Sequence, residues 1–140
     1  MRGLFLEELS VGQSAQLVRT VGEADIVAFA AVTGDTNPVH LDADYAATTS
    51  FGQRIAHGML SAGYISALLG TTLPGPGAIY LSQTLQFKRP VRIGDEVTVR
   101  ATVGGIDAAK ARVTLATVCL VNGKAVVDGE AVVMVPRQAA

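Results

Sequence analysis

Polar and apolar residues along the first half of the chain fall into helical patterns. Residues 23–33 carry apolar side chains at helical spacing and are followed by Gly34, a residue that commonly ends a helix. Thr20-Val21-Gly22-Glu23 matches the capping box that opens a helix. A helical turn is expected within residues 42–49. A second helix, residues 57–69, is apolar nearly all round, which predicts that other elements cover it on most sides.

The remaining segments have the alternating pattern and the turn residues of strands. The predicted strands are residues 14–20, 79–87, 96–103, 111–121 and 126–135. Asn122-Gly123 is a strong signal for a tight hairpin between the last two. A buried helix followed by consecutive antiparallel strands predicts an α+β fold in which the sheet curls around that helix. We expect residues 1–140 to form a single domain.

Composition and charge narrow the possible functions. Charged residues make up 16% of the chain, against about 25% in ordinary domains, so the chain has less polar surface than a solitary domain. We therefore expect part of its surface to be buried against a second subunit. A formal charge of −1 provides no field that attracts nucleic acid or an anionic membrane. Cys119 is the sole cysteine, the N-terminus lacks a secretory signal pattern, and the apolar run at residues 58–73 is shorter than the ~20 residues of a membrane helix. These features predict a cytoplasmic protein.

Both histidines of the chain lie in the region that joins the two predicted helices. Asp35 precedes His40 by five residues, and Pro38 between them predicts a shaped loop instead of a regular element. The two side chains could hold one water molecule from two sides. Taken singly, Asp35 is equally a turn residue and His40 a half-buried side chain, so their combination in one loop favours catalysis.

The start of the second helix is a candidate oxyanion site. His57 and Gly58 stand where free backbone N–H groups and the helix dipole favour negative charge. Gly58 leaves room for a substrate carbonyl, although the same glycine would also serve close helix packing. Ser66 and Ser61 on this helix are either site residues or serines bonded to the preceding turn. Because the sequence has no HExxH, CxxC or phosphate-binding glycine pattern, we expect no metal and no organic cofactor.

Two spaced motifs resemble those of a known family. Gly34-Asp35-Thr36-Asn37-Pro38-Val39-His40 and Ala56-His57-Gly58-Met59-Leu60 closely resemble the signature of MaoC-like dehydratases, specifically the (R)-specific enoyl-CoA hydratases. The similarity continues through Gly94-Asp95-Glu96-Val97 and Gly129-Glu130-Ala131-Val132-Val133, so it covers nearly the full chain. This resemblance implies a hot-dog fold, a long central helix wrapped by an antiparallel sheet, working as a homodimer.

The resemblance also implies roles for individual residues. Asp35 and His40 match the pair that activates water, Gly58 matches the glycine whose N–H binds the substrate carbonyl, and Ser66 matches a serine that supports the catalytic aspartate. Asn37 and His57 lie inside the two motifs as supporting residues. The implied reaction hydrates trans-2-enoyl-CoA to (R)-3-hydroxyacyl-CoA, with coenzyme A only as part of the substrate, as in bacterial hydratases that supply polyhydroxyalkanoate synthesis.

Three alternatives stay open at this point. A hot-dog thioesterase would hydrolyse the same thioester and release a free thiol. A non-catalytic subunit of a heterodimeric dehydratase would lend only a binding tunnel, and the complete pair of Asp35 and His40 argues against it. A 3-hydroxyacyl-acyl-carrier-protein dehydratase would keep the chemistry and change the carrier, because basic side chains suit either anionic carrier. The candidate basic residues are Arg54, Lys88, Arg89 and Arg92.

Overall fold

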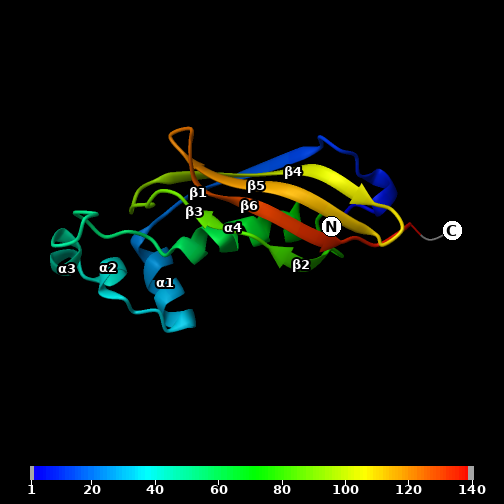
Figure 1. The fold of residues 1–140 in the computed structure, drawn as a ribbon. Coiled ribbons are helices and arrows are strands. Elements are labelled where there is room, and N and C mark those ends of the chain that lie inside the picture. The colour runs from blue at the N-terminus through cyan, green and yellow to red at the C-terminus, as the bar shows by residue number, and fades with distance from the viewer. Residues whose placement is uncertain (1, 139–140) are drawn as a thin grey trace.

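In the computed structural model, which describes residues 2–138, an antiparallel sheet packs against a long helix (Figure 1). Its strands are β1 (Ser14–Thr20), β2 (Ile79–Gln83), β3 (Gln86–Phe87), β4 (Glu96–Asp107), β5 (Arg112–Val121) and β6 (Lys124–Met134). Their order across the sheet is β1-β4-β5-β6-β2, and β3 also pairs with β6. The α+β architecture predicted from the sequence, with the sheet wrapped around a central helix, is confirmed.

The chain also forms one long helix and several shorter ones. They are η1 (Leu6–Glu8), α1 (Glu23–Thr33), α2 (Pro38–Leu41), α3 (Ala43–Ala47) and α4 (Gly58–Thr71). Figure 1 shows α4 along the sheet and α1, α2 and α3 grouped at one end. Within residues 2–138, no helix combines the length and the apolar character that crossing a membrane requires.

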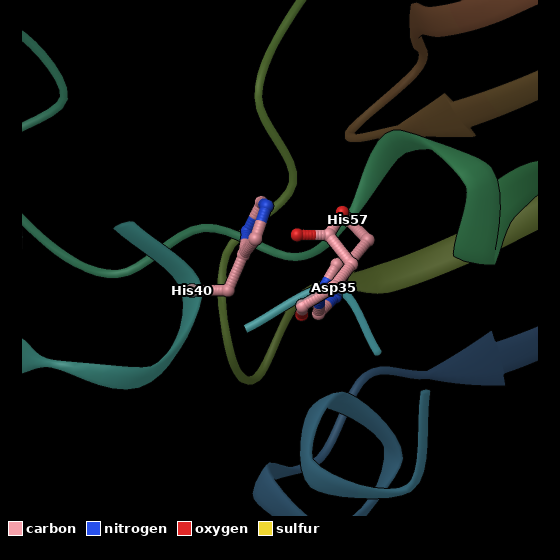
Figure 2. Close-up of side chains that lie close together, drawn as sticks. All are labelled: Asp35, His40 and His57. Carbon is pink, nitrogen blue, oxygen red and sulfur yellow. The ribbon is translucent and has the colours of Figure 1, made fainter. Parts of the chain in front are cut away.

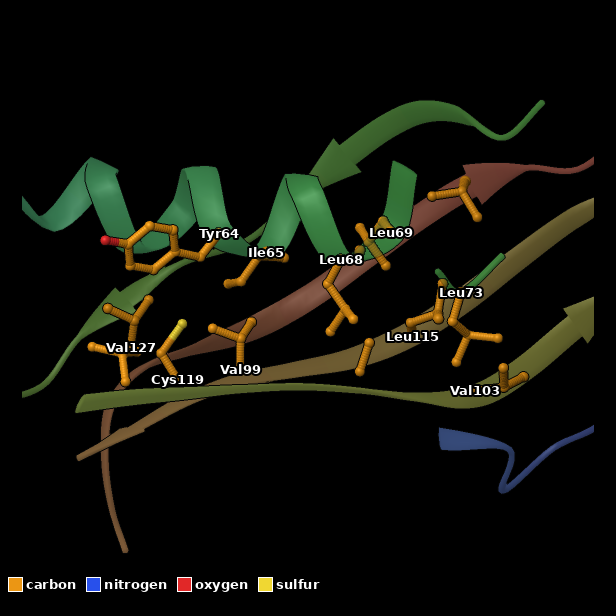
Figure 3. Close-up of a cluster of buried hydrophobic side chains, with 14 of the residues drawn as sticks. Tyr64, Ile65, Leu68, Leu69, Leu73, Val99, Val103, Leu115, Cys119 and Val127 are labelled. Atoms are coloured by element: carbon orange, nitrogen blue, oxygen red, sulfur yellow. The ribbon is translucent and has the colours of Figure 1, made fainter. Parts of the chain in front are cut away.

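The hydrophobic core lies between α4 and the strands. Tyr64, Ile65 and Leu68 of α4 point toward β4, β5 and β6 in Figure 3. The strands present alternate residues to this core, as their burial pattern shows. Those on β4 and β5 are Val97, Val99, Ala101, Val103, Val113, Leu115, Thr117 and Cys119. Because each fully buried aliphatic side chain contributes about 1.5–3 kcal/mol, this contact fixes α4, and with it the start of the helix, on the sheet.

Helix α1 begins differently from the predicted capping box. Gly22 is the N-cap, and its N–H donates to the Asp25 carboxylate at 2.8 Å. The capping box predicted between Thr20 and Glu23 was wrong, because the carboxylate that accepts the N–H of the N-cap residue is that of Asp25. Glu23 is thereby left to pair with a residue far along the chain. The predicted end of the helix is confirmed, since Gly34 adopts a left-handed φ of 78°.

The single strand predicted for residues 79–87 is in fact two strands, β2 and β3. Thr84 lies between them and crosses over Gly129 of β6, where the Thr84 carbonyl occupies the place of a side chain. The Thr84 N–H donates to the Glu130 carbonyl, and its hydroxyl accepts from the Glu130 N–H, both at 2.9 Å. Only glycine allows this close crossing, so position 129 determines where the strand breaks.

One face of α4 is uncovered in the described chain. Ile65 and Leu68 are fully buried, whereas Met59 is 53% exposed and Gly63 and Ser66 are also exposed. The prediction that other elements cover this helix on most sides is therefore not met by one copy of residues 2–138.

Candidate active site

His40 lies in α2, a short helical turn. The prediction of an irregular loop was wrong for Pro38–Leu41, because proline at the first helical position starts a helix as readily as proline later in a helix ends one. Asn37 is the N-cap, and its side-chain oxygen accepts the Val39 N–H at 3.2 Å. This turn buries His40, which is 8% exposed.

Two contacts hold the His40 ring in one orientation. Nδ1 lies 2.8 Å from the carbonyl oxygen of Ile55. Since a carbonyl only accepts, Nδ1 carries the proton and Nε2 of the neutral ring carries a free lone pair. The ring also stacks on His57, with centroids 3.8 Å apart and planes 27° from parallel. Nε2 is thus the His40 atom that can take a proton from a bound water molecule or return one.

Asp35 follows the C-terminal glycine of α1 in an exposed turn. Its carboxylate oxygen Oδ1 accepts the Asn37 N–H at 3.2 Å, and its own N–H donates to the Thr33 hydroxyl at 3.1 Å. The Asp35 carbonyl accepts a hydrogen bond from His57 Nε2 at 3.0 Å. Three hydrogen bonds therefore fix this residue, although its side chain is open to solvent.

Asp35, His40 and His57 come together from two stretches of the chain, the segment 35–40 and the residue before α4 (Figure 2). One side-chain oxygen or nitrogen of each residue lies within 4.8 Å of the others. At this upper limit of 4.8 Å, one water molecule with two hydrogen bonds of about 2.8 Å would bridge two of the atoms at an angle of about 118°. The side chains are therefore close enough for one water molecule to bridge the Asp35 carboxylate and the His40 ring.

The same three residues could in principle hold a metal ion, and their geometry tests this. Metal ions bind imidazole nitrogens in the plane of the ring, so the lone pairs of two histidine ligands must converge on one point. The rings of His40 and His57 are stacked, which sets their in-plane lone pairs side by side. His40 Nδ1 and His57 Nε2 are also engaged by backbone carbonyls. This donor set fits a bound water molecule better than a metal ion.

Gly58 and His40 line the same pocket, which has a volume of about 460 Å³. Gly58 is the first residue of α4, where the N–H has no partner inside the helix and the helix dipole is positive. A Cβ at this position would lie 2.6 Å from the Phe87 ring, so the chain tolerates no side chain there without moving Phe87. The free N–H can donate a hydrogen bond to the oxygen of a thioester, on which negative charge develops. Asp35 lies next to His40 and is not part of the wall of this pocket.

Ser66 lies apart from Gly58 and His40. It lines a second pocket of about 580 Å³ together with Phe29, Thr33 and Leu81. No hydrogen bond joins Ser66 to Asp35 among residues 2–138, so its support of Asp35 stays a prediction. Ser61, which the sequence ranked equally with Ser66, is buried and lines the pocket of Gly58.

The basic candidates for carrier binding differ in their surroundings. Lys88 and Arg89 line the pocket of Gly58, where Lys88 pairs with Asp128 at 2.8 Å and Arg89 donates to a backbone carbonyl. Arg54 instead points inward to the backbone of His40 and to Glu23. Its engagement in these contacts contradicts the expectation that it is available to an anionic carrier.

Sequence reasoning also missed Phe87, because no local pattern indicates which ring covers Gly58.

Comparison with known proteins agrees with this fold. The family model described as MaoC like domain matches residues 8–125. The chain belongs to the MaoC-like family. The (R)-specific enoyl-CoA hydratase of Rhodospirillum rubrum is 59% identical over 134 residues, which cover 96% of this chain and 93% of that protein.

Solved structures extend the similarity of this MaoC-like chain. The unliganded R-hydratase PhaJ1 from Pseudomonas aeruginosa superposes with a TM-score of 0.92 at 53% identity, covering 97% of this chain and 88% of that one. The (R)-hydratase from A. caviae involved in PHA biosynthesis gives a TM-score of 0.90 at 49% identity, covering 93% and 99%. The hot-dog fold implied by the sequence motifs is confirmed.

Proposed function

We propose that this protein is a hydro-lyase that adds water to trans-2-enoyl-CoA and forms (R)-3-hydroxyacyl-CoA, without a metal or an organic cofactor. The observation that carries the proposal is that the side chains of Asp35 and His40 converge to within 4.8 Å, and that His40 lines the same pocket as Gly58. The named (R)-hydratases among its relatives support the same reaction. By analogy with the A. caviae enzyme, the product would supply PHA biosynthesis.

In the proposed reaction, the thioester carbonyl accepts a hydrogen bond from the Gly58 N–H, which makes C3 of the conjugated double bond electrophilic. The water molecule held by Asp35 and His40 attacks C3. A proton leaves the water as the C3–O bond forms, and a proton is returned to C2 on the same face as the negative charge on the thioester oxygen collapses. The enzyme ends in its starting protonation state and consumes no co-reactant.

We assign the proton transfer to His40 and the orientation of water to Asp35. The Ile55 carbonyl keeps the proton of neutral His40 on Nδ1, so Nε2 is ready to accept the proton of the attacking water. The Asp35 carboxylate accepts a hydrogen bond from the other O–H of the same water molecule, which stays on the oxygen, and this bond aims the oxygen lone pair at C3.

Asn37, His57 and Ser66 are proposed as supporting residues. The Asn37 N–H donates to the Asp35 carboxylate, and the Asn37 side chain caps the turn that carries His40. His57 donates to the Asp35 carbonyl and stacks on His40. Ser66 shares its pocket with Thr33, whose hydroxyl accepts the Asp35 N–H, so it lies near a residue that fixes Asp35.

We further propose that two copies of this domain associate through the edge of the sheet. Strand β2 ends the strand order, and three consecutive apolar residues on it are exposed: Ile79, Tyr80 and Leu81. Such an edge invites pairing with another strand. Light scattering should give twice the 14.5 kDa mass of the chain for the wild type and for Val11→Asp, an exposed residue in a turn, but a monomer for Leu81→Asp. A monomeric wild type would contradict the dimer.

A cytoplasmic location completes the proposal, because the free thiol of Cys119 in the core needs no oxidising compartment.

The reaction itself is tested with purified protein and crotonyl-CoA. Loss of the enoyl-thioester absorbance with an (R)-3-hydroxybutyryl product supports the hydratase. Release of a free thiol would instead indicate the thioesterase. A preference for crotonyl-acyl carrier protein over crotonyl-CoA would change the assigned carrier, with Lys88 and Arg89 as its basic contacts.

A further inference from the structure

The segment just before α4 grips the turn that carries His40. The Ile55 N–H donates to the Val39 carbonyl at 3.3 Å, and the Ile55 carbonyl accepts from His40 Nδ1 at 2.8 Å. The third contact comes from a side chain, because Arg54 Nε donates to the His40 carbonyl at 2.7 Å. Residues 54 and 55 therefore hold both the backbone and the ring of His40.

A carboxylate on α1 fixes Arg54 in turn. The two terminal nitrogens of the guanidinium contact the two oxygens of Glu23, at 2.7 Å and 3.1 Å. The Arg54 side chain is only 16% exposed, whereas that of Glu23 is 57% exposed. Arginine is the one side chain that can present a fork to a carboxylate while its Nε donates elsewhere, and lysine has a single ammonium for both tasks.

The turn that carries His40 needs such support. Helix α2 has four residues, and one helical turn gains too little from its own hydrogen bonds to be stable alone. Arg54 and Glu23 connect this turn to α1, the 11-residue helix that Asp35 follows. The same ion pair thus links the segments that carry the two members of the dyad.

We propose that Arg54 is a positioning residue for His40 and that Glu23 acts through Arg54. Neither side chain touches the substrate in this account. Together they keep Nδ1 of His40 against the Ile55 carbonyl and Nε2 toward the bound water molecule. The inference rests on the proposed hydratase function, since His40 matters for turnover only if it handles the proton.

Kinetics of variants test this role. Arg54→Met, which keeps the length of the side chain and removes the fork, should lower kcat for crotonyl-CoA about tenfold with little change in KM, because misplacing a catalytic group costs rate more than binding. Arg54→Lys should recover part of that loss. Arg2→Met is the matched control, because Arg2 makes a similar two-point pair with Glu8 remote from His40. It should keep the kcat of the wild type.

Glu23→Gln tests the second half of the proposal. Alone it should lower kcat less than Arg54→Met does, and in the Arg54→Met background it should lower kcat no further. Independent, multiplying effects of the two substitutions would contradict the claim that Glu23 acts through Arg54. A folded Arg54→Met variant with the kcat of the wild type would overturn the positioning role of Arg54.

NMR of the ring N–H protons gives a readout that does not need turnover. The chain has two histidines, and each donates one ring N–H to a carbonyl, His40 from Nδ1 and His57 from Nε2. In Arg54→Met the Nδ1 proton of His40 should exchange faster than it does in the wild type and in Arg2→Met. An unchanged His40 signal would overturn the inference even if the wild type is active. A wild type without hydratase activity would refute the proposed function, and the NMR comparison would still decide the positioning role.

Discussion

Replacing Gly58 by alanine separates the chemical role of the first N–H of α4 from the stability of the helix. The added Cβ would lie 2.6 Å and 2.7 Å from two carbons of the Phe87 ring. Carbon atoms in contact prefer about 3.5–4.0 Å, so the ring must withdraw by about 1 Å. Phe87 is 55% exposed and has room to turn, at a cost of about 0.5–1.5 kcal/mol if it leaves its preferred rotamer.

The expected loss of activity is larger than the expected loss of stability. Alanine favours helix over glycine by about 0.5–1 kcal/mol in helix interiors, which offsets part of the strain. The free energy of unfolding should therefore change by no more than about 1 kcal/mol. The methyl group and the displaced ring would narrow the pocket that Gly58, Phe87 and His40 line, where the thioester carbonyl is proposed to bind. Losing one oxyanion donor costs about 10²- to 10³-fold in kcat.

The assay compares crotonyl-CoA turnover with urea unfolding for Gly58→Ala and for Gly70→Ala. Gly70 lies on the same helix, and a Cβ there would meet nothing within 4 Å, so alanine at 70 should leave turnover unchanged and stability equal or higher. Adding Phe87→Ala to Gly58→Ala should relieve the strain without restoring kcat. A Gly58→Ala variant with the kcat of the wild type would refute the role of this N–H, and recovery of kcat in the double variant would assign the loss to the Phe87 contact.

Three further outcomes follow from the site and the core. Dialysis against a chelator should leave turnover unchanged, because the stacked rings of His40 and His57 do not converge on a metal ion; loss of turnover that zinc restores would contradict this. Asn37→Ala should lower the free energy of unfolding by about 1 kcal/mol by removing the cap of α2, whereas Asn37→Asp should keep the cap; equal denaturation curves for wild type and Asn37→Ala would argue against it. Burial raises the pKa of Cys119 to about 12 from a usual 9.0, so a thiol reagent near neutral pH should label it only after unfolding. Above pH 9.0 the unfolded thiol loses its proton while the folded thiol keeps it, so Cys119 should lower the free energy of unfolding as the pH rises. A free energy of unfolding that does not change with pH in this range would contradict the expectation.

Local patterns in the sequence predicted most of the elements. Asn122-Gly123 indicated a tight hairpin, and both residues adopt the positive φ angles, 51° and 75°, that such a turn requires. The alternation along β4 and β5 predicted which side chains enter the core, since a strand has a period of two. Extending the same alternation across residues 79–87 failed, because the break at Thr84 depends on Gly129, which is distant in sequence.

The sequence motifs proposed the residues of the candidate site and left their geometry open. The motifs identified Asp35, His40 and Gly58, because these residue types suit water activation and oxyanion binding. The hydrogen bond from His57 to the Asp35 carbonyl joins residues 22 apart, and the pairing of Arg54 with Glu23 joins residues 31 apart. No local pattern specifies such contacts, so the sequence alone indicates Arg54 only as a basic residue that could bind an anionic carrier.

The most direct test of the central claim is the kcat for crotonyl-CoA hydration of Asp35→Asn and His40→Gln, measured on variants whose unfolding curves show that they are folded. Since a positioned acid or base contributes about 10²- to 10⁴-fold, both variants should lose that much kcat with a smaller change in KM. Near-wild-type turnover of both folded variants would contradict the account, because the bound water would then be activated by other groups.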